Sequence, residues 1–182
     1  EYLQGNRAAE QETIPRILRQ NPAYGKVFAD LADFSVIKRQ YGAAVEFYTA
    51  GGYATQDIDL IAPHDEALLA VMYDLGFKRE GRYFIHRPYK ILIEFPSSRL
   101  QVGEKTTAID VEGEIVSMIS LEDLIIDRLE AAKWGGSKAD FRNAILLLNQ
   151  NPNRNEVRQK AKSADVLDTL AKAIQSGVQR KK

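Results

Sequence analysis

The spacing of apolar residues changes twice along this chain, and this change limits the fold more than any other feature of the sequence. Near the beginning, apolar side chains recur every three or four residues, over Ile14–Leu18 and Val27–Phe34, which predicts amphipathic helices. In the middle third, short apolar runs separated by turn residues predict strands. From Ser120 onward the helical spacing returns. We therefore expect an α+β protein.

The predicted elements follow one another in a definite order. They are an apolar strand at Ile58–Ile61, a helix at His64–Leu75 closed by Gly76, strands at Phe77–His86 and Tyr89–Phe95, a hairpin of Ile109–Val111 with Ile115–Met118, helices opened by Ser120 and Ser137, and two shorter helices after Pro152 and Ser163. This order predicts a mixed β-sheet flanked by helices, with a helical C-terminal part. We place the division between an α/β core at 1–119 and a helical part at 120–182.

Composition narrows the class of protein. No apolar run approaches the ~18–20 residues that a membrane-spanning helix needs, so we expect no membrane association. The chain has no cysteine, which excludes a disulfide framework and a thiol nucleophile and leads us to expect a cytoplasmic protein. Lys+Arg and Asp+Glu both number 25, and this balance gives no basic excess of the kind that proteins use to hold long nucleic acids.

Two aspartates on one predicted strand are the strongest functional signal. Residues two apart on a strand project from the same face, so Asp57 and Asp59 point together while Ile58 and Leu60 enter the core. Their Cα atoms would lie about 6.5 Å apart. Carboxylates at this spacing can share one divalent ion or hold two, and hard oxygen ligands favour Mg²⁺ or Mn²⁺. Taken alone, however, an Asp-x-Asp at a strand end is more often a solvated edge.

A third acid, Glu94, stands alone inside the apolar run Ile91–Phe95. An isolated charge in such a strand is costly unless it is paired or bound to metal, so Glu94 is either an ion-pair partner of Arg99 or Lys90 or the third carboxylate of a metal site. Clustered carboxylates repel one another, and the metal-free protein therefore needs a counter-charge beside them.

The segment from Tyr41 through Gly51-Gly52 to Asp57 and Asp59 resembles the first motif of the minimal nucleotidyltransferases in the polymerase β-like superfamily. The resemblance continues through Ile93–Pro96 and Ile119–Leu129, and it covers roughly residues 35–150. Members of this group include single-domain prokaryotic proteins, some related to toxin-type nucleotidyltransferases.

The resemblance assigns roles to residues. It implies that Asp57, Asp59 and Glu94 bind the catalytic metal ions, and that Gly42, Ala43, Thr55 and Lys133 contact the nucleotide. The chain departs from the family motif at Tyr41, where the family commonly has a small residue. Either the pair of small residues is Gly42-Ala43, or triphosphate binding is altered, because only residues without a bulky side chain let the backbone approach phosphate closely.

The sequence thus predicts a Mg²⁺-dependent nucleotidyltransferase that moves a nucleoside monophosphate from a triphosphate to a hydroxyl of a protein, a tRNA or a small molecule. The alternative is a catalytically lapsed domain that keeps the fold as a binding or regulatory module, with a partner protein or a second copy, as in a toxin–antitoxin pair. Tyr41 favours the lapsed module, and the intact set of three acids favours the enzyme.

Overall fold

The computed structural model describes residues 44–45, 48–49, 57–111 and 114–179. Within them the chain is an α+β protein with a mixed sheet and several helices, as the sequence predicts. It forms two compact units, residues 1–118 and 119–182, which we term the sheet unit and the helical unit. The helices predicted over Ile14–Leu18 and Val27–Phe34 lie outside the described residues.

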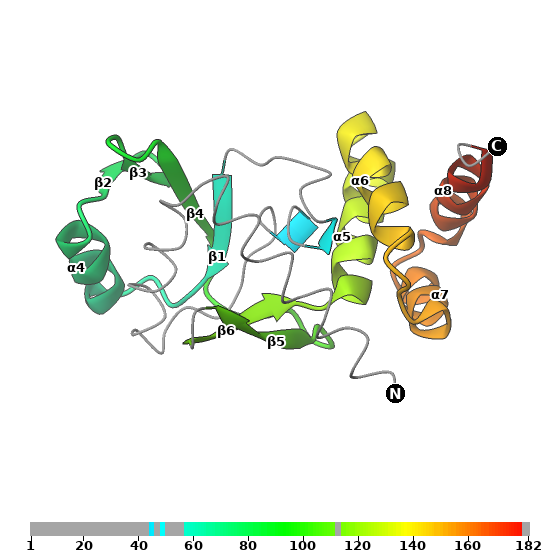
Figure 1. Ribbon diagram of the computed structural model, residues 1–182, viewed down its shortest axis with the longest axis horizontal. Helices are drawn as coiled ribbons and strands as arrows, with labels where there is room; N and C mark the ends of the chain where they lie inside the picture. Colours follow the sequence, from blue (N-terminus) through cyan, green and yellow to red (C-terminus); the bar gives the residue numbers. More distant parts are fainter. Residues whose placement is uncertain (1–43, 46–47, 50–56, 112–113, 180–182) are drawn as a thin grey trace. The chain divides into compact units, whose positions relative to one another are not determined.

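The sheet unit is built on a four-stranded sheet of order β1-β4-β3-β2 (Figure 1). Its strands are β1 (Asp57–Ile61), β2 (Lys78–Glu80), β3 (Tyr83–His86) and β4 (Ile91–Ser97). β1 pairs with β4 in parallel, and the other two pairings are antiparallel. The parallel pairing needs a long crossover, and the chain between the two strands supplies it with a helix and a hairpin.

Helix α4 (Glu66–Asp74) covers one face of this sheet. Its buried side chains Leu68, Val71 and Met72 form one core with apolar residues of the strands, namely Ile58, Leu60, Phe84, Ile91, Ile93 and Phe95. Asp65 caps the helix by accepting a hydrogen bond from the Leu68 N–H at 2.9 Å. The helix therefore begins at Glu66 and not at His64, where the sequence predicts its start. Gly76 follows with φ +84, as a helix-ending glycine does.

The prediction of a single strand over Phe77–His86 is wrong, because this segment contains a hairpin of β2 and β3. Glu80 pairs with Tyr83, so Gly81 and Arg82 form a two-residue turn between the strands. Gly81 has φ +63, a conformation that tight hairpin turns require and that glycine adopts without a steric penalty. β2 consists of charged, exposed residues, so the spacing of apolar residues did not indicate a separate strand before this turn.

The predicted hairpin near residue 113 is confirmed, since β5 (Thr106–Val111) and β6 (Glu114–Ile119) form a two-stranded sheet. Its turn residues lie outside the described part. No helix among the described residues is long and apolar enough to cross a membrane.

The helical unit contains α5 (Leu121–Trp134), α6 (Lys138–Leu148), α7 (Arg154–Ser163) and α8 (Leu167–Gln179). Ser120, Ser137 and Asn153 cap the first three by accepting from a backbone N–H three residues later, so the predicted caps Ser120 and Ser137 are confirmed. α5 packs against α6 and α7, and α6 packs against α8. With 13 residues, α8 is longer than α6 with 11, so it is not one of two shorter helices.

Candidate metal and nucleotide site

Three polar residues form a row across neighbouring strands of the sheet unit. Asp59 of β1 is paired with Glu94 of β4, and Glu94 is paired in turn with Tyr83 of β3. The adjacent row, which includes Ile58 and Ile93, belongs to the core beneath α4. Because successive side chains on a strand point to opposite faces, the row of Asp59, Glu94 and Tyr83 lies on the face opposite α4.

The pairing of β1 with β4 becomes irregular immediately after this row. Asp59 is opposite Glu94, but Ile61 is opposite Ser97, so β4 contains one extra residue. Pro96 lies in that interval, and proline has no N–H to donate to a neighbouring strand. Bulges of this kind end regular pairing and redirect side chains, and they are frequent beside functional sites. The acidic pair therefore stands at the last regular position of the parallel pairing.

Arg82 supplies the counter-charge that clustered carboxylates require. Its Nε lies 3.4 Å from Oε2 of Glu94, whose side chain is only 15% exposed, whereas the arginine side chain is 69% exposed. The guanidinium also lies 4.8 Å from the centre of the Tyr83 ring and donates to the Tyr83 hydroxyl. That hydrogen bond, and then the charges of Glu94 and Asp59, raise the pKa of Arg82.

The sequence offered Arg99 or Lys90 as ion-pair partners of Glu94, and neither is its partner in the described structure. Its cationic partner there is Arg82. Sequence reasoning anticipated a counter-charge but did not identify it. The signal was present in Gly81-Arg82, a two-residue sequence with glycine at the first turn position.

The donors present suit a divalent cation. Asp59 and Glu94 are cross-strand neighbours on strands about 4.8 Å apart. Their oxygens are the ligands that Mg²⁺ and Mn²⁺ prefer. Among the side chains that the structure describes, no three of His, Asp or Glu are close enough to hold a metal ion. The third carboxylate of the predicted set, Asp57, has its backbone in β1 opposite Leu92, and its side chain is outside the described atoms.

The predicted nucleotide-binding residues Gly42, Ala43 and Thr55 lie outside the described residues, as does Tyr41. The structure does describe a helical segment directly after Ala43. Ala44 and Val45 are helical and fully buried, and the Thr49 N–H donates to the Val45 carbonyl at 3.0 Å. The residues directly after Gly42-Ala43 are thus helical.

Lys133 belongs to a different network from the acidic row. In the helical unit its ammonium donates to the carbonyl of Asp165 and lies 3.3 Å from carboxylate oxygens of Asp165 and Asp168. Desolvation opposes the charge on Lys133, but its hydrogen bonds to these two residues still raise its pKa. Lys133 thereby links the end of α5 to the start of α8.

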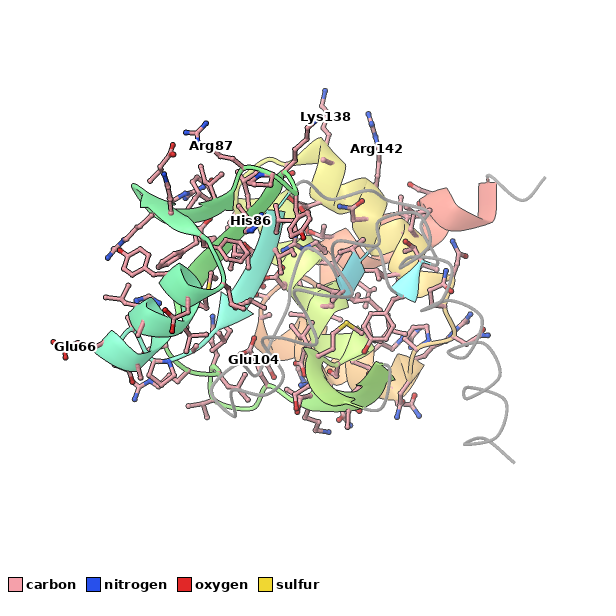
Figure 2. The ribbon with its side chains drawn as sticks, turned by 60° about the vertical axis from the view of Figure 1, so that its left-hand side comes forward. Glu66, His86, Arg87, Glu104, Lys138 and Arg142 are labelled. Carbon is pink, nitrogen blue, oxygen red and sulfur yellow. The ribbon has the colours of Figure 1, made fainter. Side chains whose placement is uncertain are left out.

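Other polar and aromatic residues have structural partners of their own. The Asp140 N–H donates to the Ser137 hydroxyl at 3.1 Å, and the Asp140 carboxylate receives a 2.8 Å bond from Arg128. His86 stacks on Tyr89 with ring centres 4.5 Å apart, at the turn after β3 where Arg87 also projects (Figure 2). His64 packs edge-on against a phenylalanine of β4. Packing and capping explain these positions.

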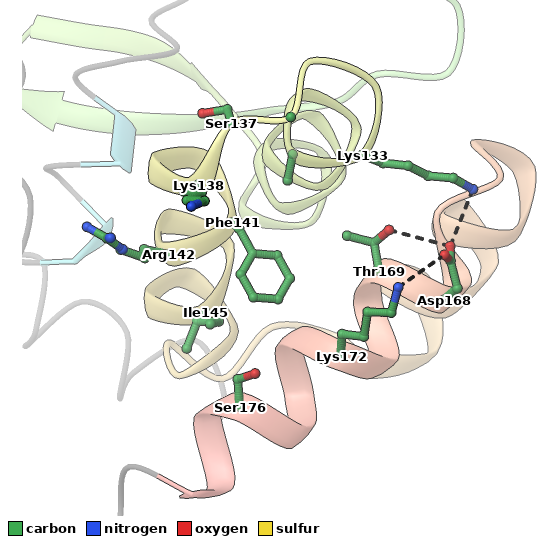
Figure 3. A pocket seen from close by; sticks show the side chains of 12 residues that line it. Lys133, Ser137, Lys138, Phe141, Arg142, Ile145, Asp168, Thr169, Lys172 and Ser176 are labelled. Carbon is green, nitrogen blue, oxygen red and sulfur yellow. Dashed lines mark hydrogen bonds and ion pairs between the residues drawn. The ribbon is translucent and has the colours of Figure 1, made fainter.

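The helical unit contains a cavity of about 540 Å³ between α5, α6 and α8 (Figure 3). Phe141 projects into it from α6, and Lys133 and Lys172 approach Asp168 on its opposite side. The lining includes one acidic side chain, Asp168, and four basic ones, Lys133, Lys138, Arg142 and Lys172. It lies wholly within one unit.

Similarity to known proteins is found at the level of structure. No protein-family model matches the sequence, and no curated protein sequence matches it either. The solved structure of ANT(2'')-Ia in complex with adenylyl-2''-tobramycin matches with a TM-score of 0.55 at 17% identity, over 81% of this chain and 97% of that one. An antigenic nucleotidyltransferase-like protein from Paracoccidioides brasiliensis matches with a TM-score of 0.53 at 17% identity, over 85% of this chain and 91% of that one.

A solution structure of ANT(2'')-Ia matches with a TM-score of 0.50 at 17% identity, over 90% of this chain and 96% of that one. These likenesses extend over most of the chain and include both compact units. The fold expected from the motif around Asp57 and Asp59 is therefore confirmed, and this chain has the nucleotidyltransferase fold.

Proposed function

We propose that this protein is a metal-dependent nucleotidyltransferase that moves a nucleoside monophosphate from a nucleoside triphosphate to a hydroxyl acceptor and releases pyrophosphate. The observation that carries the proposal is the direct pairing of Asp59 with Glu94 on a nucleotidyltransferase fold. Two carboxylates held side by side at the end of regular strand pairing are an unfavourable arrangement without cations. A bound divalent cation would neutralise the two charges, so a metal site accounts for this arrangement.

In this proposal Asp57, Asp59 and Glu94 hold Mg²⁺ or Mn²⁺. Bound ions of this type stabilise the charge that develops on the attacking and leaving oxygens in phosphoryl transfer. Glu94 is also proposed to help deprotonate the acceptor hydroxyl, as the family resemblance implies.

The nucleotide is proposed to lie against the segment that contains Gly42, Ala43 and Thr55, as the family resemblance implies. Lys133 stands apart in this scheme. To reach a phosphate it would have to leave both Asp165 and Asp168, so we assign its ammonium a structural role in the helical unit.

The acceptor is proposed to be a compact hydroxyl-bearing molecule in preference to a long nucleic acid. The ANT(2'')-Ia structure holds a small molecule, tobramycin, that carries an adenylyl group, and this chain matches 97% of that protein's length. The present chain also has equal numbers of acidic and basic residues, 25 each, which disfavours an RNA acceptor bound mainly through phosphates. A protein hydroxyl and a tRNA end are the other acceptors to test. The proposed compartment of the protein is the cytoplasm.

Thermal unfolding with ligands tests the proposed site. Wild type, an Asp59→Asn/Glu94→Gln double variant and an Asp74→Asn control would be unfolded with Mg²⁺ and each of the four common nucleoside triphosphates. A ligand present at about a hundred times its dissociation constant adds roughly 2.7 kcal/mol to the free energy of unfolding. We expect a metal-dependent shift in wild type and in the control, and none in the double variant. Equal shifts in all three proteins would refute the site, and no shift in any of them would favour the lapsed binding module.

A further inference from the structure

The ion pair between Arg82 and Glu94 has features of a temporary contact. The Nε–Oε2 distance of 3.4 Å is longer than the 2.7–2.9 Å of a charge-assisted hydrogen bond. The arginine side chain is 69% exposed and belongs to the two-residue turn after β2, so little packing holds it in place. The guanidinium donates a hydrogen bond to the hydroxyl of Tyr83 and lies over the ring of the same residue, which is its neighbour in the sequence. The guanidinium can therefore leave Glu94 without disturbing the core.

The carboxylates, in contrast, are fixed. Asp59 and Glu94 lie on the paired strands β1 and β4, and the residues that precede them, Ile58 and Ile93, are buried in the core beneath α4. A mobile cation thus faces a rigid acidic pair. Any divalent cation that binds the pair competes with the arginine for the same negative charge, because the two positive charges repel each other when both lie beside Glu94.

We propose that Arg82 is a replaceable counterion, which neutralises the acidic pair in the metal-free protein and is displaced from Glu94 when a divalent cation binds. This inference rests on the function proposed above. It assigns Arg82 a positioning role, since the residue acts through Glu94, whose negative charge it neutralises while no metal is bound. It also predicts that Arg82 lowers the affinity for metal instead of raising it.

Direct binding of Mn²⁺, without nucleotide, tests this role. Free Mn²⁺ would be followed by electron paramagnetic resonance during titration of the full chain as wild type, Arg82→Gln, Arg82→Lys, Arg87→Gln and Asp59→Asn/Glu94→Gln. Arg87 is a matched control, because its side chain is 70% exposed and pairs with Glu80 instead of Glu94. We expect Arg82→Gln to bind Mn²⁺ about fivefold more tightly, the size appropriate to losing one exposed charge pair.

The controls separate this inference from the proposed function. Arg82→Lys and Arg87→Gln should match wild type, and the gain in Arg82→Gln should shrink as KCl rises from about 50 to about 500 mM, because salt screens exposed charges. If Mn²⁺ binds wild type but not Asp59→Asn/Glu94→Gln, and Arg82→Gln binds no more tightly than Arg87→Gln, the counterion role is refuted while the metal site stands. If Mn²⁺ binds none of these proteins, both proposals fall.

Discussion

Asp59 and Glu94 are directly paired residues on the parallel strands β1 and β4, and both lie on the face of the sheet opposite α4. Like charges directly opposite one another weaken strand pairing, yet here they occupy the last regular position of the parallel pairing. The core beneath them fixes the strands, so the repulsion is not relieved by moving apart. The stability of the sheet unit should therefore depend on what occupies this acidic pair.

The first prediction concerns Asp59→Asn. In the presence of EDTA this variant should unfold at a higher urea concentration than wild type, with a gain of up to about 1 kcal/mol, because Glu94 then has Arg82 to itself. Added Mg²⁺ should stabilise wild type but not the variant. Asp74→Asn, which removes an exposed acid at the end of α4, should behave as wild type does. A variant that is less stable in EDTA, or one that still responds to Mg²⁺, would contradict the assignment.

The second prediction concerns the turn that carries Arg82. Gly81 has φ +63 and no atom within 4 Å of the position where a Cβ would be, so alanine there meets backbone strain but no steric clash. Gly81→Ala should lower the free energy of unfolding by about 1 kcal/mol. Gly81→Asn should cost clearly less, since asparagine tolerates this conformation. Chemical unfolding followed by circular dichroism measures both, and equal losses in the two variants would show that strain is not the cause.

The third prediction concerns a shielded ion pair in the helical unit. Lys160 Nζ lies 2.6 Å from Asp123 Oδ1, and the two side chains are 19% and 8% exposed. Lys160→Met leaves the Asp123 carboxylate without this partner and should cost about 2 kcal/mol of stability, less than for a fully buried pair because some solvent reaches the lysine. Lys172→Met is the matched control, because that lysine is 71% exposed and 3.8 Å from its partner Asp168. Its loss should be close to zero, and similar losses for both lysines would contradict the importance of shielding.

The fourth prediction is a pH dependence at Asp168. A hydrogen bond from the Thr169 backbone, followed by the interactions with Lys133, lowers the pKa of Asp168 below its ordinary value of 3.8. A carboxyl whose pKa is lower in the folded state stabilises the protein above the unfolded value and loses that contribution as the pH falls through the folded value. Asp168→Asn should thus be less stable than wild type at pH 7, and the difference should shrink as the pH falls below about 3.8 and vanish once the pH is below the lowered pKa of the folded state. Urea midpoints across this range test it, and a difference that persists in acid would contradict it.

Local sequence signals predicted much of the fold. The strand at Ile58–Ile61, the helix that follows it and the serine caps of α5 and α6 depend on residues within a few positions of one another, and these are the features that spacing and capping rules describe. The hairpin within Phe77–His86 was missed because β2 consists of three charged, exposed residues, which do not show the apolar pattern of a separate strand.

Contacts between distant residues account for what the sequence left open. The pairing of Asp59 with Glu94 was anticipated from an isolated charge in an apolar strand, but the identity of the counter-charge depends on the register of β3 with β4. The role of Lys133 likewise depends on Asp165, 32 residues further along the chain. Rules based on residue spacing describe contacts within one helix or hairpin, and they do not predict contacts between residues so distant in the sequence.

The most direct test of the proposed activity uses nucleoside triphosphates labelled at the α- or the γ-phosphate, with Mg²⁺ and three kinds of acceptor: tobramycin, tRNA and the protein itself. We predict that the α-label alone is transferred to an acceptor, that pyrophosphate is released in equal amount, and that Asp59→Asn/Glu94→Gln abolishes both while Asp74→Asn retains them. Transfer of the γ-label, or α-label transfer that survives in the double variant, would contradict the assignment of these two carboxylates to nucleotidyl transfer.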